Sequence, residues 1–553
     1  MPGSIALYHP SAGVRPKTNM FGKDVANVGL FRAVLQHGDF DRVDFLTGAT
    51  ISPFDLAIGL TGEAALAAKT GVAGLLDQSR PAEAGVLVRG TPDLPEMAWL
   101  RRSSGLEQAY SLVGMVHTLA PPALREATAK AAIAPIQPWD ALICTSPVVQ
   151  ERLTAMFDEW TDYLADRYGG DVRVRPHLPL LPLGVEGARF AALADRPEAR
   201  AAMREQLGAA PDDIVILWVG RLSFFEKAFP TPMFLAAEEA ARASGVRVHF
   251  AQVGWFPDPT VQRAMYEEAG RAHAPSVAMH YIDGNDPEVV GAMWAAGDIF
   301  LSLVDNIQET FGITPLEAMA AGLPVVVSDW DGYRFTVRDG IDGFTIRSLG
   351  GPIGAGQGMI NRHVHLGLTY QSYVGAVAQH TAIHVGDAAA RIGELIASPE
   401  LRARMREAGR RRIRETFDWP VVVAGLQDLL GELAAIRKAA APQPVRHKYN
   451  PLKGEPFGAF APFATQVLGY DTMVSLRPGV GQADLDRTVG VRLDEFAGNW
   501  RANVALCAQL MDRLAAGGEM PVRELLAPHP RAHHAALGLA VVWMCKLGLL
   551  DWR

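Results

Sequence analysis

The 553-residue sequence predicts an α/β protein in which two doubly wound domains face a cleft and a small, mainly helical domain follows. Two observations support this fold class. Short apolar strands alternate with helical segments over residues 1–205 and again over 206–417, which is the pattern of a parallel sheet. A stretch rich in Pro and Ala at 439–456 then indicates a linker before the tail at 457–553.

In the first region, SIALYHP predicts a buried strand and DVANVGLFRAVLQHG a helix that ends at Gly38. The strand VDFLT follows, so strand, loop, helix and strand fall within about 45 residues, as in a βαβ unit. GVLVRG, SLVGMVHTL and ALICTS predict further strands, and VVQERLTAMFDEWTDYLADRY predicts a long helix. We expect the helix at 418–438 to return to this N-terminal domain.

The second region repeats the pattern with greater regularity. IVILWVG, VRVHFAQVG, IFLSLV and PVVVSD predict strands, and the helices between them each end at glycine. Ligands of doubly wound sheets bind in the crevice at the carboxyl ends of the strands, so we expect a site there. An insertion containing Gly and His interrupts the pattern at 348–384.

Composition limits the classes of function. The chain has 52 Lys and Arg residues and 60 Asp and Glu residues, a net charge of −8, which argues against a protein that coats nucleic acid. Hydrophobic residues make up 49% of the chain and charged residues 20%, which is typical of a well-cored globular protein. The three cysteines form neither a disulfide framework nor a metal knuckle. With no secretory signal and no uninterrupted apolar run of about 20 residues, we expect a cytoplasmic protein.

The densest chemical pattern is the segment ETFGITPLE, residues 309–317. The pattern predicts a helix that begins near Thr314 and Pro315, because Thr is a good N-cap and Pro suits the first helical position. The free N–H groups of such a helix, beside Gly312, form a ready anion site. Glu317 would lie in the first turn, where a capping-box acid is the alternative to a functional role.

This segment resembles the signature of retaining glycosyltransferase family 4, of the group 1 type, in which two Glu residues are separated by seven residues. That family has the GT-B architecture of two Rossmann-like domains. VGRLSFFEKAFP and HYIDGNDPEVVGAMWAAGDIFLSL extend the resemblance, and MVHTLAPP, WDALICTS and PLLPLGVE match more loosely. It covers roughly residues 1–440; the tail is instead similar to a winged-helix module.

The resemblance implies roles for individual residues. Glu317 would accept hydrogen bonds from the ribose of a nucleotide sugar, and Glu309 would face the transferred sugar at the reacting centre. Arg221 and Lys227 would bind the diphosphate and stabilise the leaving group in place of a metal ion. His117 would bind the donor sugar. The remaining substrate-binding positions are Gly22 at a helix start and the segment Thr310, Phe311, Gly312, Ile313 and Thr314.

The sequence departs from the family pattern near the phosphate loop. Five residues separate Arg221 from Lys227 where the family usually has four, and Ala228 replaces a glycine, so Glu226 could pair with Lys227. Leu183 stands where the family commonly has Asn. The loop PKTNMFGKD is similar to the Lys-Thr-Gly-Gly loop of glycogen and starch synthases, so its lysines, Lys17 and Lys23, either reach phosphate or are solvated.

Several other patterns leave alternatives open. Asp329 and Asp331 match an Asp-x-Asp metal motif, and His363, His365, His380 and His384 have spacings that suit zinc on a strand and a helix or are solvated loop histidines. The seven arginines of 402–414 form a solvated helix face or contact an anionic membrane. The last helix of the tail, AALGLAVVWMCKLG, is apolar and nearly uncharged, which favours packing or dimerisation over DNA recognition.

We therefore expect a retaining, metal-independent transferase without a cofactor. It would move a hexose from a donor such as a UDP- or GDP-hexose to a glycan or glycolipid acceptor in bacterial cell-surface polysaccharide or lipopolysaccharide biosynthesis. The alternatives are an α-glucan synthase and a catalytically silent GT-B scaffold or regulatory protein. Expected partners exclude nucleic acid and include peripheral contact with the inner face of the membrane and a second copy bound through the tail.

Overall fold

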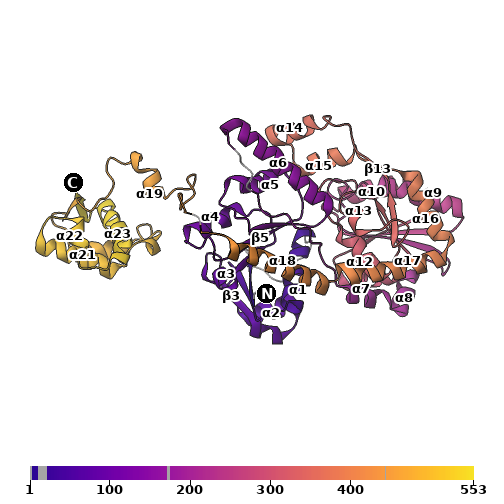
Figure 1. Ribbon diagram of the computed structural model, residues 1–553, viewed down its shortest axis with the longest axis horizontal. Helices are drawn as coiled ribbons and strands as arrows, with labels where there is room; N and C mark the ends of the chain where they lie inside the picture. The colour runs from indigo at the N-terminus through magenta and orange to yellow at the C-terminus, as the bar shows by residue number, and fades with distance from the viewer. Residues whose placement is uncertain (1–2, 10–21, 171–174, 443) are drawn as a thin grey trace. The chain divides into compact units, whose positions relative to one another are not determined.

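The computed structural model describes residues 3–9, 22–170, 175–442 and 444–553, except the side chain of Lys23. The chain divides into two compact units, Met1–Lys448 and Tyr449–Arg553, and each is considered by itself. The larger unit contains two six-stranded parallel sheets with helices packed on their faces (Figure 1). The predicted α/β fold with two doubly wound, Rossmann-like domains is confirmed.

The first sheet has the strand order β3-β2-β1-β4-β5-β6. The order reverses between β1 and β4, which makes this gap the switch point where doubly wound sheets bind ligands. The short edge strand β3 escaped prediction because its sequence, TGVAG, is not a typical apolar strand. The elements of this domain are β1 (Ser4–His9), α1 (Gly22–His37), β2 (Arg42–Thr47), α2 (Pro53–Thr61), β3 (Thr70–Gly74), α3 (Ser79–Ala84), β4 (Val86–Arg89), α4 (Pro95–Ser103), β5 (Ser111–Val116), α5 (Pro122–Ala129), β6 (Ala141–Cys144) and α6 (Pro147–Tyr168).

The second sheet has the order β12-β11-β10-β7-β8-β9, which is the same winding with its switch point between β7 and β10. The predicted strands β7, β8, β10 and β11 are present, and Gly245, Gly297 and Gly322 follow helices as expected. The elements are β7 (Ile214–Val219), α9 (Thr231–Ser244), β8 (Val248–Gly254), α10 (Val261–His273), β9 (Ala278–Asp283), α11 (Pro287–Ala296), β10 (Ile299–Ser302), α12 (Ile313–Ala321), β11 (Val325–Ser328), α13 (Tyr333–Thr336), β12 (Gly343–Ile346), α16 (Val385–Ala397) and α17 (Pro399–Arg412).

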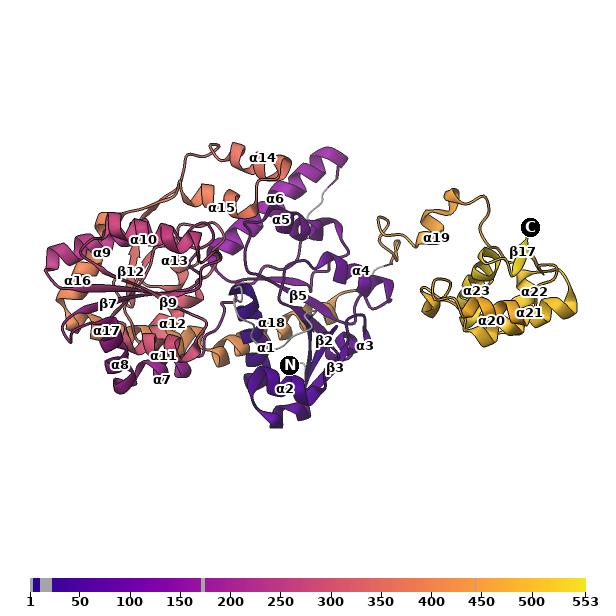
Figure 2. The same ribbon diagram turned by 180° about the vertical axis from the view of Figure 1, so that it is seen from behind.

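Three helices link the two domains. The helices α7 (Gly187–Ala194) and α8 (Pro197–Leu207) precede β7 in the chain and pack against α11 and α12 of the second domain. Helix α18 (Trp419–Ala439) crosses back to lie beside α1, as both views show (Figure 2). Arg437 of α18 donates a hydrogen bond to the carbonyl of Gly85 at 2.6 Å.

Among the described residues, α18 is the helix whose length and hydropathy would suit a membrane span, with 21 residues and an 18-residue window of mean hydropathy 1.3. Its apolar face packs in the core of the first domain, where Leu426, Leu430 and Leu433 are buried. The sequence shows no uninterrupted apolar run here because Asp428 and Glu432 divide it. Its packing is that of a core helix.

The insertion at 348–384 forms a pair of helices, α14 (Gln357–Leu366) and α15 (Tyr370–Ala378), closed at its base by the antiparallel strands β13 (Ser348–Leu349) and β14 (Ala382–Ile383). His363 and His365 therefore lie on a helix, not on the strand that was expected. His363 stacks on Tyr373, with ring centroids 5.2 Å apart. Across the described residues, no group of three or more His, Cys, Asp or Glu side chains could hold a metal ion.

The smaller unit has a three-stranded antiparallel sheet, β16-β15-β17, and its own buried core. The predicted similarity of this unit to a winged-helix module stays a prediction. Helix α23 packs Leu537, Val541 and Met544 into that core. The elements are α19 (Pro456–Ala459), β15 (Met473–Leu476), α20 (Gln482–Val489), α21 (Val504–Gly517), β16 (Met520–Pro521), α22 (Val522–Leu526), α23 (His534–Lys546) and β17 (Leu550–Trp552).

A fully buried ion pair ties α4 to the strands of the first sheet. Both terminal nitrogens of Arg101 donate to the carboxylate of Asp140 at 2.7 Å, and neither side chain is exposed. Asp140 also accepts the backbone N–H groups of Leu112 and Gln137, each at 2.8 Å. The carboxylate of Asp140 thus accepts hydrogen bonds from both the guanidinium and the backbone. The free-energy cost of removing its charge from water is offset only while Arg101 is present.

We expect Arg101→Met to lower the free energy of unfolding by about 3–5 kcal/mol, because it leaves a buried carboxylate without its counter-ion. Arg80→Met is the matched control, since Arg80 pairs with Glu83 near the surface of the same domain. That change should cost less than about 1 kcal/mol. Urea unfolding followed by circular dichroism measures both, and equal losses would contradict the role of the buried pair.

Candidate functional site

The loops that follow β7 and β10 diverge at the switch point of the second sheet. These two strands are paired neighbours, so the loops at their carboxyl ends begin side by side. The loop after β7 carries Arg221 and Lys227, and the loop after β10 carries Glu309. The topology therefore brings together three of the residues that the sequence predicts for the site.

Lys227 and Glu309 form an ion pair, with Nζ 3.2 Å from Oε2. Burial raises the pKa of Glu309, but Lys227 and the backbone N–H groups of Phe311 and Thr310 outweigh burial and lower it below the usual range. Glu309 is therefore a carboxylate at neutral pH. Both side chains keep some exposure, 30% for Lys227 and 16% for Glu309, so a ligand can reach them.

Arg221 pairs with Glu226 at 2.6 Å, and both side chains are about nine-tenths buried. The expectation that Glu226 would pair with Lys227 is wrong, because Lys227 pairs with Glu309 instead. Gln371 of the insertion donates to the second oxygen of Glu226 at 3.3 Å. Each cation of the phosphate loop thus has its own carboxylate partner.

Thr310 joins the two doubly wound domains. Its hydroxyl donates to the carbonyl of His117 at 2.6 Å, and its own carbonyl accepts from the hydroxyl of Ser146 at 2.9 Å. Asn27 donates from its amide nitrogen to the carbonyl of Gly90 at 3.1 Å, which turns its oxygen towards Nε2 of His117, 2.8 Å away. A neutral His117 therefore carries its proton on Nε2 in this network.

Helix α12 begins two residues earlier than predicted. Gly312 is its N-cap with φ 86°, and Ile313, not Pro315, is the first helical residue. A Cβ on Gly312 would lie 1.9 Å from Cε1 of Tyr333, so the close ring requires glycine there. Thr314 is the second helical residue, and Glu317 lies beyond the first turn, which rules out the capping-box role.

Phe311 points away from the cleft into the core. It is 2% exposed, and its ring meets that of Phe417 at 6.1 Å. Only its backbone is therefore available to a ligand, as the resemblance implied. The hydroxyl of Tyr333 hydrogen-bonds with that of Ser302 at 3.1 Å, which helps to hold the ring beside Gly312.

Glu317 lines a cavity of about 220 Å³ between the domains, with Arg32 and Arg189 among the other lining residues. Burial raises the pKa of Glu317 to about 7; Arg189 opposes this rise and Glu186 adds to it. Glu186 itself pairs with Arg32 at 2.7 Å and Arg189 at 3.1 Å. The two glutamates of the motif therefore differ, because Glu309 is ionised whereas Glu317 titrates near neutrality.

Only some of the residues that the sequence predicts for the site near the N-terminus lie in the described part of the chain. Gly22 is the first residue of α1, and a Cβ there would meet nothing within 4 Å. No contact in the described part of the chain therefore requires glycine at this position. Lys17 and the side chain of Lys23 lie outside the described residues. Leu183 is buried with 4% exposure and acts as a core residue.

Two acidic residues near the site were not predicted to belong to it. Asp305, in the loop after β10, is 1% exposed, and burial raises its pKa to about 8 although the backbone N–H of Phe229 donates to it. Asp331 lies within 3.5 Å of the Ser146 hydroxyl, whereas Asp329 pairs with Arg334 at 3.0 Å. The sequence carries no signal at Asp305, whereas the Asp-x-Asp spacing had marked Asp331 only as a possible metal ligand.

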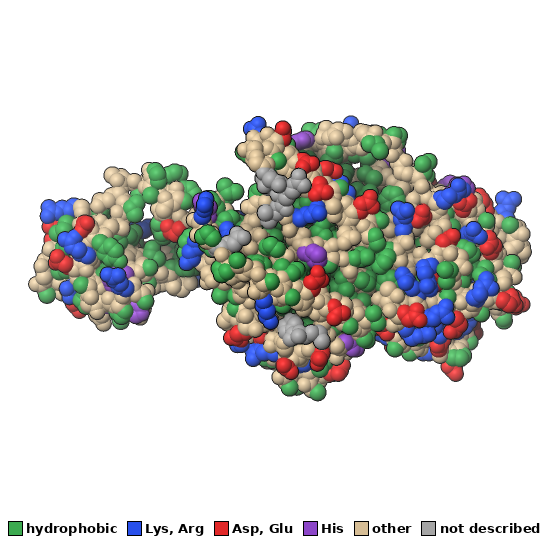
Figure 3. Space-filling view, viewed as in Figure 1, with side chains coloured by type: hydrophobic (Ala, Val, Ile, Leu, Met, Phe, Trp, Pro, Cys, Tyr) green, Lys and Arg blue, Asp and Glu red, His purple; other side chains and the backbone are tan. Residues whose placement is uncertain are grey.

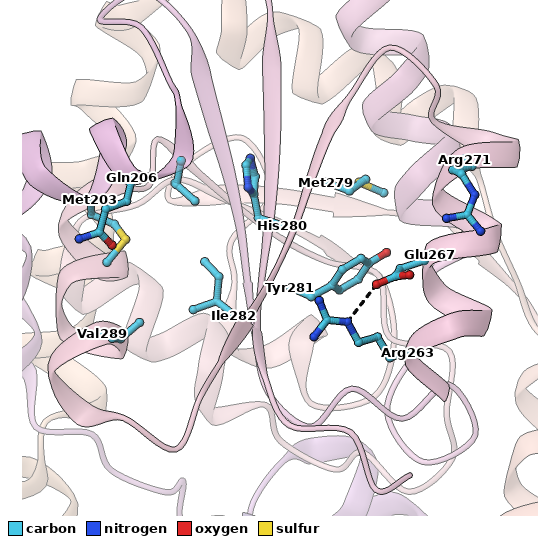
Figure 4. Close-up of a pocket in the computed structure, with 11 residues that line it drawn as sticks. Met203, Gln206, Arg263, Glu267, Arg271, Met279, His280, Tyr281, Ile282 and Val289 are labelled. Atoms are coloured by element: carbon cyan, nitrogen blue, oxygen red, sulfur yellow. Dashed lines mark hydrogen bonds and ion pairs between the residues drawn. The ribbon is translucent and has the colours of Figure 1, made fainter. Parts of the chain in front are cut away.

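A second hollow, of about 540 Å³, lies along the edge strand β9 (Figure 4). Arg263 and Glu267 of α10 form an ion pair at 2.9 Å beside Tyr281. No residue predicted for the site lines this hollow, and β9 is separated from the switch point by β8. It is therefore distinct from the candidate site.

The arginines of 402–414 are largely engaged within the fold. Arg406 and Arg410 pair with Asp195, Arg402 donates to the carbonyl of Leu395, and Arg412 lies over the ring of Phe417 at 5.0 Å. Figure 3 shows basic and acidic side chains interspersed on the visible face of the larger unit. Contact with an anionic membrane stays a prediction.

Comparison with known proteins finds a family match within the second domain. Residues 213–350, which include every strand of the second sheet, match the family described as glycosyl transferases group 1. D-inositol 3-phosphate glycosyltransferase of Nocardia farcinica is 30% identical over 256 residues, 46% of this chain and 53% of that protein. The enzyme of the same name from Geodermatophilus obscurus is 29% identical over 258 residues, 45% of this chain and 53% of that protein. The chain spans about half the length of these curated relatives.

Solved structures show similarity across more of the chain. Anabaena Alr3699/HepE in complex with UDP-glucose has a TM-score of 0.48 and 16% identity, covering 78% of this chain and 99% of that one. WaaG, described as a glycosyltransferase involved in lipopolysaccharide biosynthesis, has a TM-score of 0.43 and 16% identity, covering 79% and 100%. The residues that match group 1 glycosyl transferases, 213–350, include Arg221, Lys227, Glu309 and Glu317.

Proposed function

We propose that this protein is a retaining glycosyltransferase that moves a hexose from a nucleotide diphosphate sugar, such as a UDP- or GDP-hexose, to an acceptor hydroxyl. The observation that carries the proposal is the pair of Lys227 and Glu309 at the switch point, next to the Thr310 hydroxyl that reaches His117. The match of this segment to glycosyl transferases group 1 supports it.

The diphosphate of the donor would take the place of the carboxylates as the partner of the two cations. Lys227 and Arg221 would then stabilise the negative charge that develops on the leaving nucleoside diphosphate. Glu309, released from Lys227, would face the sugar carbon as it becomes positively charged. In our proposal the metal-independent site therefore contains both the cations for the leaving group and the carboxylate for the sugar.

In the proposed reaction, the bond between the sugar carbon and the phosphate oxygen breaks while the acceptor oxygen bonds to that carbon on the same face. The leaving phosphate oxygen takes the proton of the acceptor hydroxyl, so no protein base is consumed. His117, held by Asn27, would bind a hydroxyl of the donor sugar and orient it. Glu317 would bind the ribose in its carboxylate form.

We retain bacterial cell-surface polysaccharide or lipopolysaccharide biosynthesis as the proposed setting, with a glycan or glycolipid acceptor. The α-glucan synthase alternative depends on the lysines near residues 17–23, which the structure does not describe. Under the scaffold alternative, the pair of Lys227 and Glu309 would be a structural contact alone. Hydrolysis of a nucleotide sugar by the purified chain would separate an enzyme from a scaffold.

Substitution of Glu309 and of Glu317 should change different kinetic and binding parameters. Glu309→Gln should lower kcat on the order of 10²-fold while leaving nucleoside diphosphate affinity unreduced, because Lys227 loses a competing partner. Glu317→Gln should instead weaken nucleoside diphosphate binding, by about 1.5–3 kcal/mol for a lost hydrogen bond to a charged group. Calorimetric titration and initial rates measure both. An equal loss of affinity in the two variants would show that the roles are not divided.

Removal of metal ions should leave the transfer rate unchanged, because fixed cations face the diphosphate. The measurement compares rates before and after EDTA, with Lys227→Met as the variant that should lose both diphosphate affinity and rate. Loss of activity in EDTA, with recovery on addition of Mg²⁺ or Mn²⁺, would contradict the assignment of Arg221 and Lys227 to the diphosphate. Asp329 and Asp331 would then be the candidate metal ligands.

Donor affinity should depend on pH through Glu317. Its carboxylate accepts the ribose hydroxyls, and its pKa is about 7 in the free protein, so affinity should rise roughly tenfold from pH 6 to pH 8. A nucleotide diphosphate sugar is the right probe, because its diphosphate is esterified at both ends and does not titrate in this range. Glu317→Gln should abolish the dependence; an unchanged slope in that variant would assign it to another group.

A further inference from the structure

We infer that Asn306 and Gln308 are positioning residues, which hold the loop of Lys227 against the loop of Glu309 and so fix the ammonium group that would bind the diphosphate. The inference rests on the proposed function and deepens it. It adds two residues that act through Lys227 without touching the substrate. Neither of them is among the residues that the sequence predicts for the site.

Lys227 lies in a connection that has no regular structure of its own. In the described chain, neither helix nor strand lies between β7, which ends at Val219, and α9, which begins at Thr231. A lysine side chain is a flexible four-carbon stem, so its ammonium group stays in one place only if the backbone beneath it is fixed. The side chain of Lys227 is 30% exposed, which leaves it room to move. Contacts from outside the connection must therefore hold the backbone.

Two side-chain amides of the loop after β10 supply such contacts. The amide nitrogen of Asn306 donates a hydrogen bond to the backbone carbonyl of Phe225 at 2.6 Å. The amide nitrogen of Gln308 donates to the backbone carbonyl of Glu226 at 3.2 Å. These two carbonyls belong to the residues that directly precede Lys227. The amides therefore fix the direction in which the chain enters the lysine.

Asn306 also holds the loop that carries Glu309. Its side-chain oxygen accepts the backbone N–H of Gln308 at 2.9 Å, which turns its amide nitrogen towards the other loop. Its backbone carbonyl accepts the N–H of Glu309 at 3.2 Å and the indole N–H of Trp330 at 3.0 Å. One residue thus contacts the loops of both members of the pair that Lys227 forms with Glu309.

A third contact fixes the chain on the other side of the lysine. The carboxyl group of Asp305 accepts the backbone N–H of Phe229, two residues after Lys227, at 3.3 Å. Asp305 is 1% exposed and Asn306 is fully buried. Water cannot readily replace a partner at such sites, so the loss of one of these hydrogen bonds is costly. The backbone of Lys227 is therefore held from both directions.

These contacts would persist when a donor binds. Lys227 pairs with Glu309 at 3.2 Å in the structure, and a diphosphate would separate this pair. The hydrogen bonds from Asn306 and Gln308 involve backbone carbonyls and not the ammonium group, so they do not depend on the pair. A cation that is already in place stabilises developing charge without the cost of reorganisation. We therefore expect the two amides to be needed for tight diphosphate binding.

The first test measures nucleoside diphosphate affinity of the full chain by calorimetric titration with UDP and with GDP. Asn306→Ala should weaken binding of the preferred nucleotide about tenfold, and Gln308→Ala, which removes the longer hydrogen bond, about threefold. Gln427→Ala is the matched control, because Gln427 is also a buried amide with backbone partners, at Asp39, but lies on α18. It should bind the nucleotide as the unaltered chain does. Unchanged affinity in Asn306→Ala and Gln308→Ala would overturn the inference.

The second test separates positioning from a general effect on the fold. A double-mutant cycle combines Asn306→Ala with Lys227→Met and compares the nucleotide affinities of the four proteins. If Asn306 acts through the lysine, its substitution should change affinity less than about twofold once the lysine is gone. An undiminished loss in the Lys227→Met background would show that Asn306 acts by another route and would overturn the inference. Because Gln308 is partly exposed, Gln308→Ala provides the same cycle if Asn306→Ala does not fold.

The outcomes also separate this inference from the proposed function. If Lys227→Met loses nucleotide affinity but Asn306→Ala and Gln308→Ala bind as the unaltered chain does, the positioning inference is wrong and the transferase survives. If Lys227→Met binds the nucleotide as tightly as the unaltered chain does, the proposed role of the lysine fails, and the positioning inference fails with it.

Discussion

Thr310 is held between the two doubly wound domains by hydrogen bonds to both its hydroxyl and its carbonyl. The partners, His117 and Ser146, follow the neighbouring strands β5 and β6, so the carboxyl edge of the first sheet holds the loop that leaves β10. This constraint turns the preceding residue, Glu309, towards Lys227. It also forces the following backbone past the ring of Tyr333, where only glycine fits at position 312.

Three carboxyl groups at the domain boundary have different properties because their surroundings differ. Glu309 faces an ammonium group and two backbone N–H groups, which keep it ionised despite burial. Glu317 and Asp331 lack a directly paired cation, and burial holds their pKa values near 7. One motif with two glutamates can therefore contain a permanent charge and a titrating group. The separation of pKa values is set by the neighbours, not by the type of residue.

The insertion connects the phosphate loop of the second domain with the cleft face of the first. Gln371 hydrogen-bonds to Glu226, which in turn holds Arg221, and the Cβ of Phe225 lies so close to Gly375 that a side chain there would clash. On the same helix, Tyr373 and Val374 pack with Ala120 of the first domain. A segment that interrupts the regular βα pattern thus contacts both halves of the candidate site.

The sequence by itself determined the two series of alternating strands and helices and most of the buried strands. It did so because strands buried on both faces leave continuous apolar runs and because helices end at glycine. It also determined the group of polar residues at one sheet edge. It could not show that Glu226 pairs with Arg221 while Lys227 pairs with Glu309, since those distances depend on how the loops after β7 and β10 meet. The start of α12 at Gly312 depends equally on Tyr333, a residue 21 positions away. Only the tertiary structure decides which side chains become neighbours, because pairing between loops is a matter of space and not of sequence order.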